Sequence, residues 1–96
     1  MLESLTADTF SPHVGETFTV QADAGRLELT LTAANTWGQP FDGSRMPFTL
    51  VFHGPLEPVL RQQIRPVEHP SLGTLEIFLV PTGPDKGKMR YEAVFT

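Results

Sequence analysis

The amino-acid sequence predicts an all-β protein: a small antiparallel barrel or sandwich of about six strands, with a short helical turn near the N-terminus. Three observations predict this class. Apolar and polar residues alternate in one segment after another, glycine and proline separate the segments, and 96 residues allow only one compact core. No internal repeat or low-complexity tract divides the chain, so we treat residues 1–96 as a single all-β domain.

The first two predicted strands cover residues 17–22 and 27–33, in which every second residue is apolar. Successive side chains of a strand project to opposite faces, so each segment offers one apolar face to a core. With both apolar faces on the same side of a hairpin, Val20 pairs with Leu29. Residues 23–26, Asp-Ala-Gly-Arg, then form a four-residue loop.

Three more alternating segments follow at residues 48–53, 74–80 and 89–95. The middle one carries apolar residues on both faces, including Phe78, which predicts a central strand covered on both sides. The last two segments form a second hairpin if Leu79 faces Tyr91. Their connection, residues 82–88, is rich in Gly, Pro and Lys and is expected to be a mobile loop.

A sixth strand over residues 64–68 contains Pro66, which has no N–H to donate, so this strand must lie at an edge or carry a bulge. The preceding stretch reads as irregular, because Pro55 and Pro58 rule out a regular strand, and residues 59–63 form one turn of helix or none.

At the N-terminus, Thr6 is placed to cap a helical turn over residues 7–10, which Pro12 would end. Phe10 and Val14 would then plug one end of the core.

Charge and composition exclude several classes of function. The net charge is −4, and the chain up to Leu60 holds seven acids against two Arg, which disfavours nucleic-acid binding. The basic cluster at residues 86–90 is short and reads as a solvated loop. No Cys is present, so disulfides and thiolate metal sites are excluded. The N-terminus has no basic or apolar leader and no apolar run could span a bilayer, which predicts a cytoplasmic protein without membrane contact, while leaving room for incorporation into an extracellular or tail-like assembly.

The residues that could carry chemistry do not form a motif. His13, His53 and His69 lie at no local metal-ligand spacing, and adjacent Glu68 and His69 point to opposite faces of a strand. The three histidines are interpreted as ordinary polar surface or rim residues, with His69 ending a strand before a Pro-Gly turn. No nucleophile motif or phosphate-binding loop is present, so we expect no enzyme activity, no catalytic residues, no metal and no cofactor.

Residues 35–46 form a long connection for so small a domain. This connection contains Trp37, Phe41 and Arg45, residue types that are enriched at binding hot spots. Two alternatives remain: Trp37 and Phe41 fold back as a lid over the barrel end, or they present a binding surface. His69, in the His-Pro-Ser-Leu-Gly turn, is a further candidate for binding if a ligand pocket opens between this turn and the Trp37 connection.

The runs FTLVFHGP, VEHPSLGTLEIFLVPTG and YEAVF resemble a family of small bacterial proteins known as a domain of unknown function, over nearly the whole chain. Turn and core positions carry the resemblance: Gly15, Phe18, Gly54-Pro55, His69-Pro70, Leu72-Gly73 and Phe78 to Pro81. Such positions imply a shared all-β fold and bring no catalytic residues. The resemblance also implies a gene context near phage-tail-collar-like proteins.

These observations favour a non-enzymatic structural or assembly module that presents an edge strand or the Trp37 connection to a protein partner or to a second copy of itself. The alternative is a β-barrel that binds a small ligand, for example a sugar or a lipid, at one barrel mouth.

Overall fold

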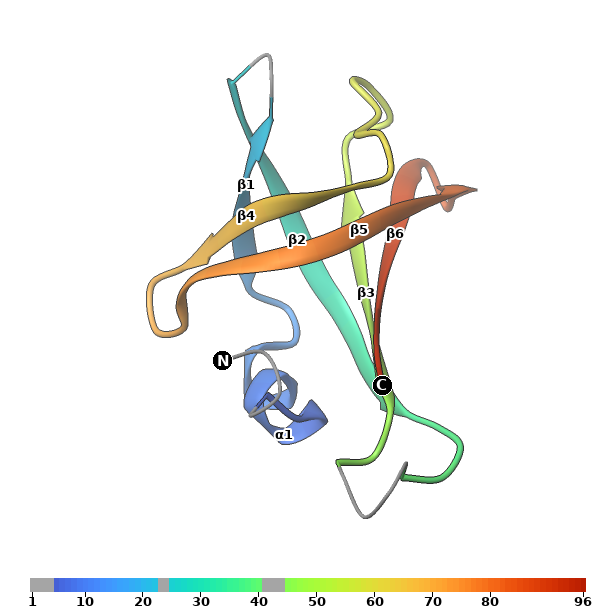
Figure 1. Ribbon diagram of the computed structural model, residues 1–96. Coiled ribbons are helices and arrows are strands. Elements are labelled where there is room, and N and C mark those ends of the chain that lie inside the picture. The colour runs from blue at the N-terminus through green and yellow to red at the C-terminus, as the bar shows by residue number, and fades with distance from the viewer. Residues whose placement is uncertain (1–4, 23–24, 41–44) are drawn as a thin grey trace.

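The computed structural model describes residues 5–22, 25–40 and 45–96. The structure is a closed antiparallel barrel with the strand order β1-β2-β3-β6-β5-β4, which confirms the all-β prediction and selects a barrel over a sandwich (Figure 1). A short helix α1 and a 3-10 turn η2 precede the barrel. The elements are α1 (Ala7–Phe10), η2 (Ser11–His13), β1 (Thr17–Ala22), β2 (Gly25–Thr36), β3 (Phe48–Gly54), β4 (Gln63–His69), β5 (Gly73–Asp85) and β6 (Lys88–Phe95).

The β1–β2 hairpin has a different register from the one predicted. Val20 pairs with Leu27 rather than Leu29, and the ladder continues to Ala22 and Gly25. A shift of two residues leaves every side chain on the same face, so apolar alternation cannot distinguish the two registers. Gly25 adopts a φ of +127°, which lets the ladder run closer to the turn than a four-residue loop would allow.

The β5–β6 hairpin is also longer than predicted. The prediction of a mobile loop over residues 82–88 is wrong, because the strands extend to Asp85 and from Lys88. Asp85 pairs with Lys88 across Lys86 and Gly87, whose φ angles are +53° and +81°. Two consecutive positive φ values are typical of the tight type I′ turn, whose twist matches that of the strands. The pairing of Leu79 with Tyr91 is therefore wrong as well, because Tyr91 pairs with Pro81.

The ladders between neighbouring strands differ greatly in length. The β1–β4 ladder consists only of Thr19 with Glu68 and Val20 with Val67, and the next position on β4 is Pro66. Proline has no N–H to offer that ladder. The prediction was an edge strand or a bulge, and β4 instead lies between β1 and β5 in the closed barrel, with its β1 side paired only at Val67 and Glu68. β5 is not covered on both faces as predicted, because Phe78 is 47% exposed.

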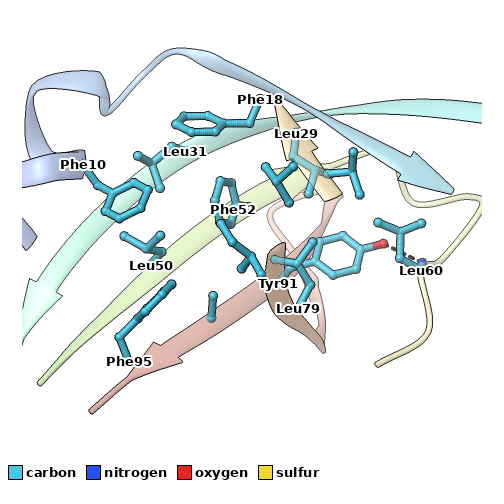
Figure 2. Close-up of a cluster of buried hydrophobic side chains, with 14 of the residues drawn as sticks. Phe10, Phe18, Leu29, Leu31, Leu50, Phe52, Leu60, Leu79, Tyr91 and Phe95 are labelled. Carbon is cyan, nitrogen blue, oxygen red and sulfur yellow. Dashed lines mark hydrogen bonds between the residues drawn. The ribbon is translucent and has the colours of Figure 1, made fainter. Parts of the chain in front are cut away.

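The core fills the barrel from end to end (Figure 2). At one end Phe10 of α1 is fully buried against the rings of Phe48 and Phe95, which confirms its predicted role as a plug. Val14 does not share that role, because it is 44% exposed. At the other end Leu60 is buried and its backbone N–H donates to the hydroxyl of the buried Tyr91, at 2.9 Å.

The connections agree with the remaining predictions. Thr6 begins the helical turn, and its N–H donates to Thr9 Oγ1 at 3.1 Å. The α-helical turn ends at Phe10 and continues as the 3-10 turn that contains Pro12. Residues 55–62 form neither helix nor strand.

Candidate functional site

Trp37 follows β2 and lies on the outer side of the barrel wall. Its indole Nε1 donates to Thr49 Oγ1 at 2.9 Å, and its backbone N–H donates to Pro47 O at 3.0 Å. Thr49 lies between Phe48 and Leu50, both fully buried, so its own side chain faces outward. The Trp37 side chain is 41% exposed at this position.

Arg45 ties three segments of the chain together. Its Nε donates to the carbonyl of Thr96 at 3.1 Å, and its Nη1 donates to the carbonyl of Leu5 at 2.7 Å. The guanidinium also lies 5.5 Å from the ring centres of Phe48 and Phe95. These contacts hold the N-terminal segment over the Phe10 end of the core. Phe41, the other predicted residue of this connection, lies outside the described residues.

His69 is not the surface residue that the sequence suggested, because it is 7% exposed and packs against Phe18 at 4.6 Å between ring centres. Its Nε2 lies 2.6 Å from Glu16 Oε1, and the same oxygen lies 2.8 Å from His13 Nδ1. The two imidazoles meet edge to face at 4.5 Å. We call these three residues the His69 cluster.

Adjacent Glu68 points to the opposite side, as predicted. Its carboxylate accepts hydrogen bonds from Arg26 at 2.6 Å and Gln21 at 2.9 Å on the outside of the barrel. Glu68 therefore attaches β4 to β1 and β2 on the outside, whereas His69 attaches it to Glu16 before β1 and packs on Phe18 of β1.

Donor and acceptor chemistry determines the protons in the His69 cluster. The backbone N–H of Ser71 donates to His69 Nδ1 at 3.0 Å, so this nitrogen is an acceptor and carries no proton. The proton of the neutral ring must then be on Nε2, from which it is donated to Glu16. The hydrogen bonds from His13 and His69 hold the pKa of Glu16 below its ordinary value of 4.5.

The three ligand-type atoms of this cluster lie within 4.8 Å of one another, a donor set of the kind that zinc prefers. The hydrogen bond from Ser71 argues against that use. A histidine that binds metal through Nε2 carries its proton on Nδ1 and donates it to an acceptor. Here Nδ1 faces a donor, so the cluster is arranged for a proton and does not fit a metal ion.

A second group of polar residues, the His53 cluster, crosses the outer wall. His53 Nδ1 lies 2.9 Å from Thr32 Oγ1, and His53 Nε2 lies 2.9 Å from Asp85 Oδ2. Thr32 also lies 3.1 Å from the carbonyl of Val51, to which its hydroxyl can donate. The hydrogen bond from His53 holds the pKa of Asp85 below its ordinary value of 3.8.

The β-sheet positions the His53 cluster through a bulge. The β2–β3 register shifts between Leu31 and Ala33, so Thr32 is the extra residue. Bulges turn a side chain out of the regular pleat and are frequent beside binding sites. A surface hollow of about 430 Å³ lies here, lined by Thr30, Thr32, His53, Asp85, Lys86 and Lys88.

The wall formed by β4 and β5 exposes large apolar side chains. Ile64 and Phe78 pair across these strands and are 60% and 47% exposed. Val94 on β6 is 57% exposed. The β5–β6 ladder ends with Val80 opposite Glu92, and two further residues in the same register would bring Phe78 opposite Val94.

The predicted site residues do not converge. Trp37 bonds to β3, Arg45 joins chain segments, and His69 belongs to a cluster with His13 and Glu16 that the sequence did not reveal. The grouping of Thr32, His53 and Asp85 was missed as well. Its members come from three strands, and the only local signal was that the Lys-Gly pair at 86–87 suits a tight turn.

Comparison with known proteins identifies the family. No helix in the described parts of the chain is long and apolar enough to cross a membrane. No curated protein and no solved structure matches the chain. The model of one family, a domain of unknown function named DUF6916, matches residues 5–95, from Leu5 through the end of β6. The chain therefore belongs to the DUF6916 family.

Proposed function

We propose that this protein is a non-enzymatic binding module that captures a protein partner by adding one of the partner's extended segments to β5. The observation that carries the proposal is the split pairing of β5. Gly73–Leu79 pairs with β4 on one edge, and only Val80–Asp85 pairs with β6 on the other. Within the described residues, the second edge of Gly73–Leu79 pairs with no strand (Figure 1).

An unpaired edge offers backbone N–H and C=O groups to another chain, and most proteins protect such edges with Pro, Lys or a bulge. The β5 segment Gly73–Leu79 contains none of these and carries a single charge, Glu76. By contrast, the edge of β4 beside β1 carries Pro66. The difference supports β5 as the edge that is used for pairing.

The side chains beside this edge suit a protein surface. Ile64 and Phe78 form an exposed apolar pair on the outer face, and Val94 is an exposed apolar residue on β6. Exposed aromatic and aliphatic side chains with few charges are typical of the centre of protein interfaces. An added strand would cover Phe78 while its backbone completes the ladder.

The setting that we propose is a tail-like or surface assembly, in which small β domains pair with extended segments of neighbouring subunits. This setting rests on the resemblance of the chain to a family of small bacterial proteins and on the unpaired edge of β5. A cytoplasmic localisation before incorporation into such an assembly, and the lack of catalysis, are part of the same proposal.

A ligand in the barrel mouth is less well supported. The rings of Phe10, Phe48 and Phe95 occupy one end of the barrel, and Leu60 and Tyr91 occupy the other. Trp37 and His69 have separate partners, on β3 and near β1 respectively, and line no common hollow among those described.

The test uses a library of random twelve-residue linear peptides, selected against the purified protein. We expect selected peptides to shift the backbone amide signals of Gly73–Leu79 in NMR spectra. Phe78→Lys should weaken their binding by at least about tenfold, whereas Leu56→Lys, at a similarly exposed apolar residue in the 55–62 connection, should not. Both side chains are about half exposed, so both variants should fold.

Two results would overturn the proposal. One is a set of peptides that binds Phe78→Lys as tightly as the unmodified protein. The other is amide shifts that gather around Trp37 and Thr49 instead of β5. Concentration-dependent self-association that Phe78→Lys abolishes would support the same edge with a second copy as the partner.

A further inference from the structure

The hollow beside His53 is independent of the β5 edge. It lies on the outside of the barrel, where the β2 bulge, the end of β3 and the β5–β6 turn meet. We propose that this hollow binds a small oxyanion, such as a phosphate or an organic carboxylate, between Lys86 and Lys88.

The charges of the lining favour an anion. Lys86 and Lys88 form no ion pair among the described residues, whereas Arg26 and Arg90 are paired with Glu68 and Glu92. Two lysines thus line one hollow, in a chain whose net charge is −4. The sequence suggested that these lysines belong to a solvated loop, but the tight turn at 86–87 holds them beside a defined surface.

Asp85 is the one acid of the lining, and its charge is already engaged. Its Oδ2 is 2.9 Å from His53 Nε2, and its lowered pKa follows chiefly from that hydrogen bond. The charge of Lys86 also lowers the pKa of Asp85, so a bound anion would be attracted by the two lysines against the charge of this one carboxylate. The net charge of the lining stays positive in this arrangement, with two lysines against one acid.

The backbone around the hollow has the features of a preformed site. Thr32 is displaced by the bulge and turned toward His53. Lys86 adopts a φ of +53°, which is uncommon for a residue other than Gly. Such positions persist when the surrounding structure holds them, and they are frequent at ligand clamps. Here the ladder between Asp85 and Lys88 holds the turn.

Thr32 also lets the imidazole adapt to a bound anion. The hydroxyl has one proton, which it can donate either to Val51 O or to His53 Nδ1. When the hydroxyl donates to Val51 O, the Thr32 oxygen can accept a hydrogen bond from His53 Nδ1 while Nε2 donates to Asp85. The ring therefore keeps a hydrogen-bond partner on each nitrogen in either arrangement.

A hollow of about 430 Å³ is large enough for phosphate or for a small organic acid. The donor groups of its lining, the ammonium groups of Lys86 and Lys88 and the hydroxyl of Thr30, recognise the oxygen atoms that both ligands share. The hydrocarbon parts of the lysine and threonine side chains would additionally contact the body of an organic acid.

The experiment is an NMR titration of the 15N-labelled full chain with sodium phosphate and, separately, with sodium benzoate, against sodium chloride at matched ionic strength. We expect saturable amide shifts at Thr30, Thr32, His53 and Lys86–Lys88, with a Kd of about 1–10 mM for at least one of the two anions. Tighter binding of phosphate identifies an inorganic or phosphate-bearing ligand, and tighter binding of benzoate identifies an organic acid.

The variant Lys86→Gln/Lys88→Gln should raise that Kd by at least about tenfold. Arg61→Gln is the matched control, because it removes an exposed positive charge from outside the hollow. Shifts that match those of chloride for both anions would overturn the proposal. Equal weakening by Arg61→Gln would also overturn it, since that would show attraction by overall charge alone.

Discussion

The two histidine clusters both pair an imidazole with a carboxylate and differ in what faces Nδ1 of the ring. His69 ends β4, is bonded to a glutamate, and has its Nδ1 occupied by the backbone N–H of Ser71. His53 lies near the end of β3, is bonded to an aspartate, and has its Nδ1 facing the hydroxyl of Thr32. An N–H can only donate, whereas a hydroxyl can donate or accept.

This difference gives the two histidines different roles, one in holding the fold and one in meeting a ligand. The His69 side chain is 5% exposed, and its tautomer is set by a group that cannot move without unfolding the turn. The His53 side chain is 17% exposed and lies in a surface hollow beside two lysines. We infer that the His69 cluster holds the short β1–β4 seam together, and that the His53 cluster is the one available to a ligand.

Removing each ring in turn should give the largest contrast. His69→Ala leaves a void beside Phe18 and removes a hydrogen-bond donor from Glu16, so we expect the free energy of unfolding to fall by about 2–4 kcal/mol. His53→Ala removes a more exposed pair and should cost less than about 1 kcal/mol. Urea unfolding of both variants measures the two values, and equal losses would contradict the division of roles.

Lowering the pH should also distinguish the two histidine clusters, with a smaller effect on stability. The pKa of Glu16 is lowered in the folded state, mainly by the hydrogen bond from His13, so the carboxylate stabilises the fold above its ordinary pKa of 4.5. This stabilisation is lost as the pH falls through the lowered pKa of the folded state. A plot of Tm against pH should therefore decline below about pH 5. Glu16→Gln should make that decline shallower.

Asp85→Asn is the matched control for the decline of Tm in acid. Its pKa is also lowered, by His53, but its ordinary value is 3.8, so its contribution should disappear at a lower pH than that of Glu16. If Asp85→Asn removes the decline of Tm near pH 5 while Glu16→Gln leaves it unchanged, Asp85 and not Glu16 causes that decline, which would contradict the prediction.

Zinc should produce the smallest effect, although His13, Glu16 and His69 are ligand types that zinc accepts. Binding through His69 Nε2 would place a proton on Nδ1, against the N–H of Ser71. We therefore expect one equivalent of Zn²⁺ to leave Tm unchanged at pH 7. A stoichiometric zinc complex with a raised Tm that Glu16→Gln abolishes would show that the turn rearranges to admit the metal.

Much of the fold follows from local patterns in the sequence. Alternation in β1, β2, β3 and β6 predicts which side chains face the core, and Phe10 was identified as a plug from its place after Thr6. The exact pairing was not accessible, because Val20 opposite Leu27 and Val20 opposite Leu29 place the same faces inward. Phe78 was misjudged since apolar character alone does not say whether a neighbouring strand covers a side chain.

The site was less accessible than the fold. His69 and Glu16 are 53 residues apart, and His53 and Asp85 are 32 apart, so no local spacing could join them. Their meeting depends on the order of strands in the barrel and on the bulge at Thr32. The composition of the Trp37 connection predicts a binding surface, whereas the interactions described for Trp37 and Arg45 are mostly with their own barrel wall and chain ends.

The most direct test of the division between the two clusters is a long-range 1H–15N NMR spectrum of the three imidazole rings at pH 7, recorded with and without sodium phosphate. The account predicts that His69 carries its proton on Nε2 and none on Nδ1, and that phosphate, or benzoate where that anion binds more tightly, leaves the His69 signals in place while shifting those of His53. A proton on His69 Nδ1, or a phosphate response at His69 with none at His53, would contradict it.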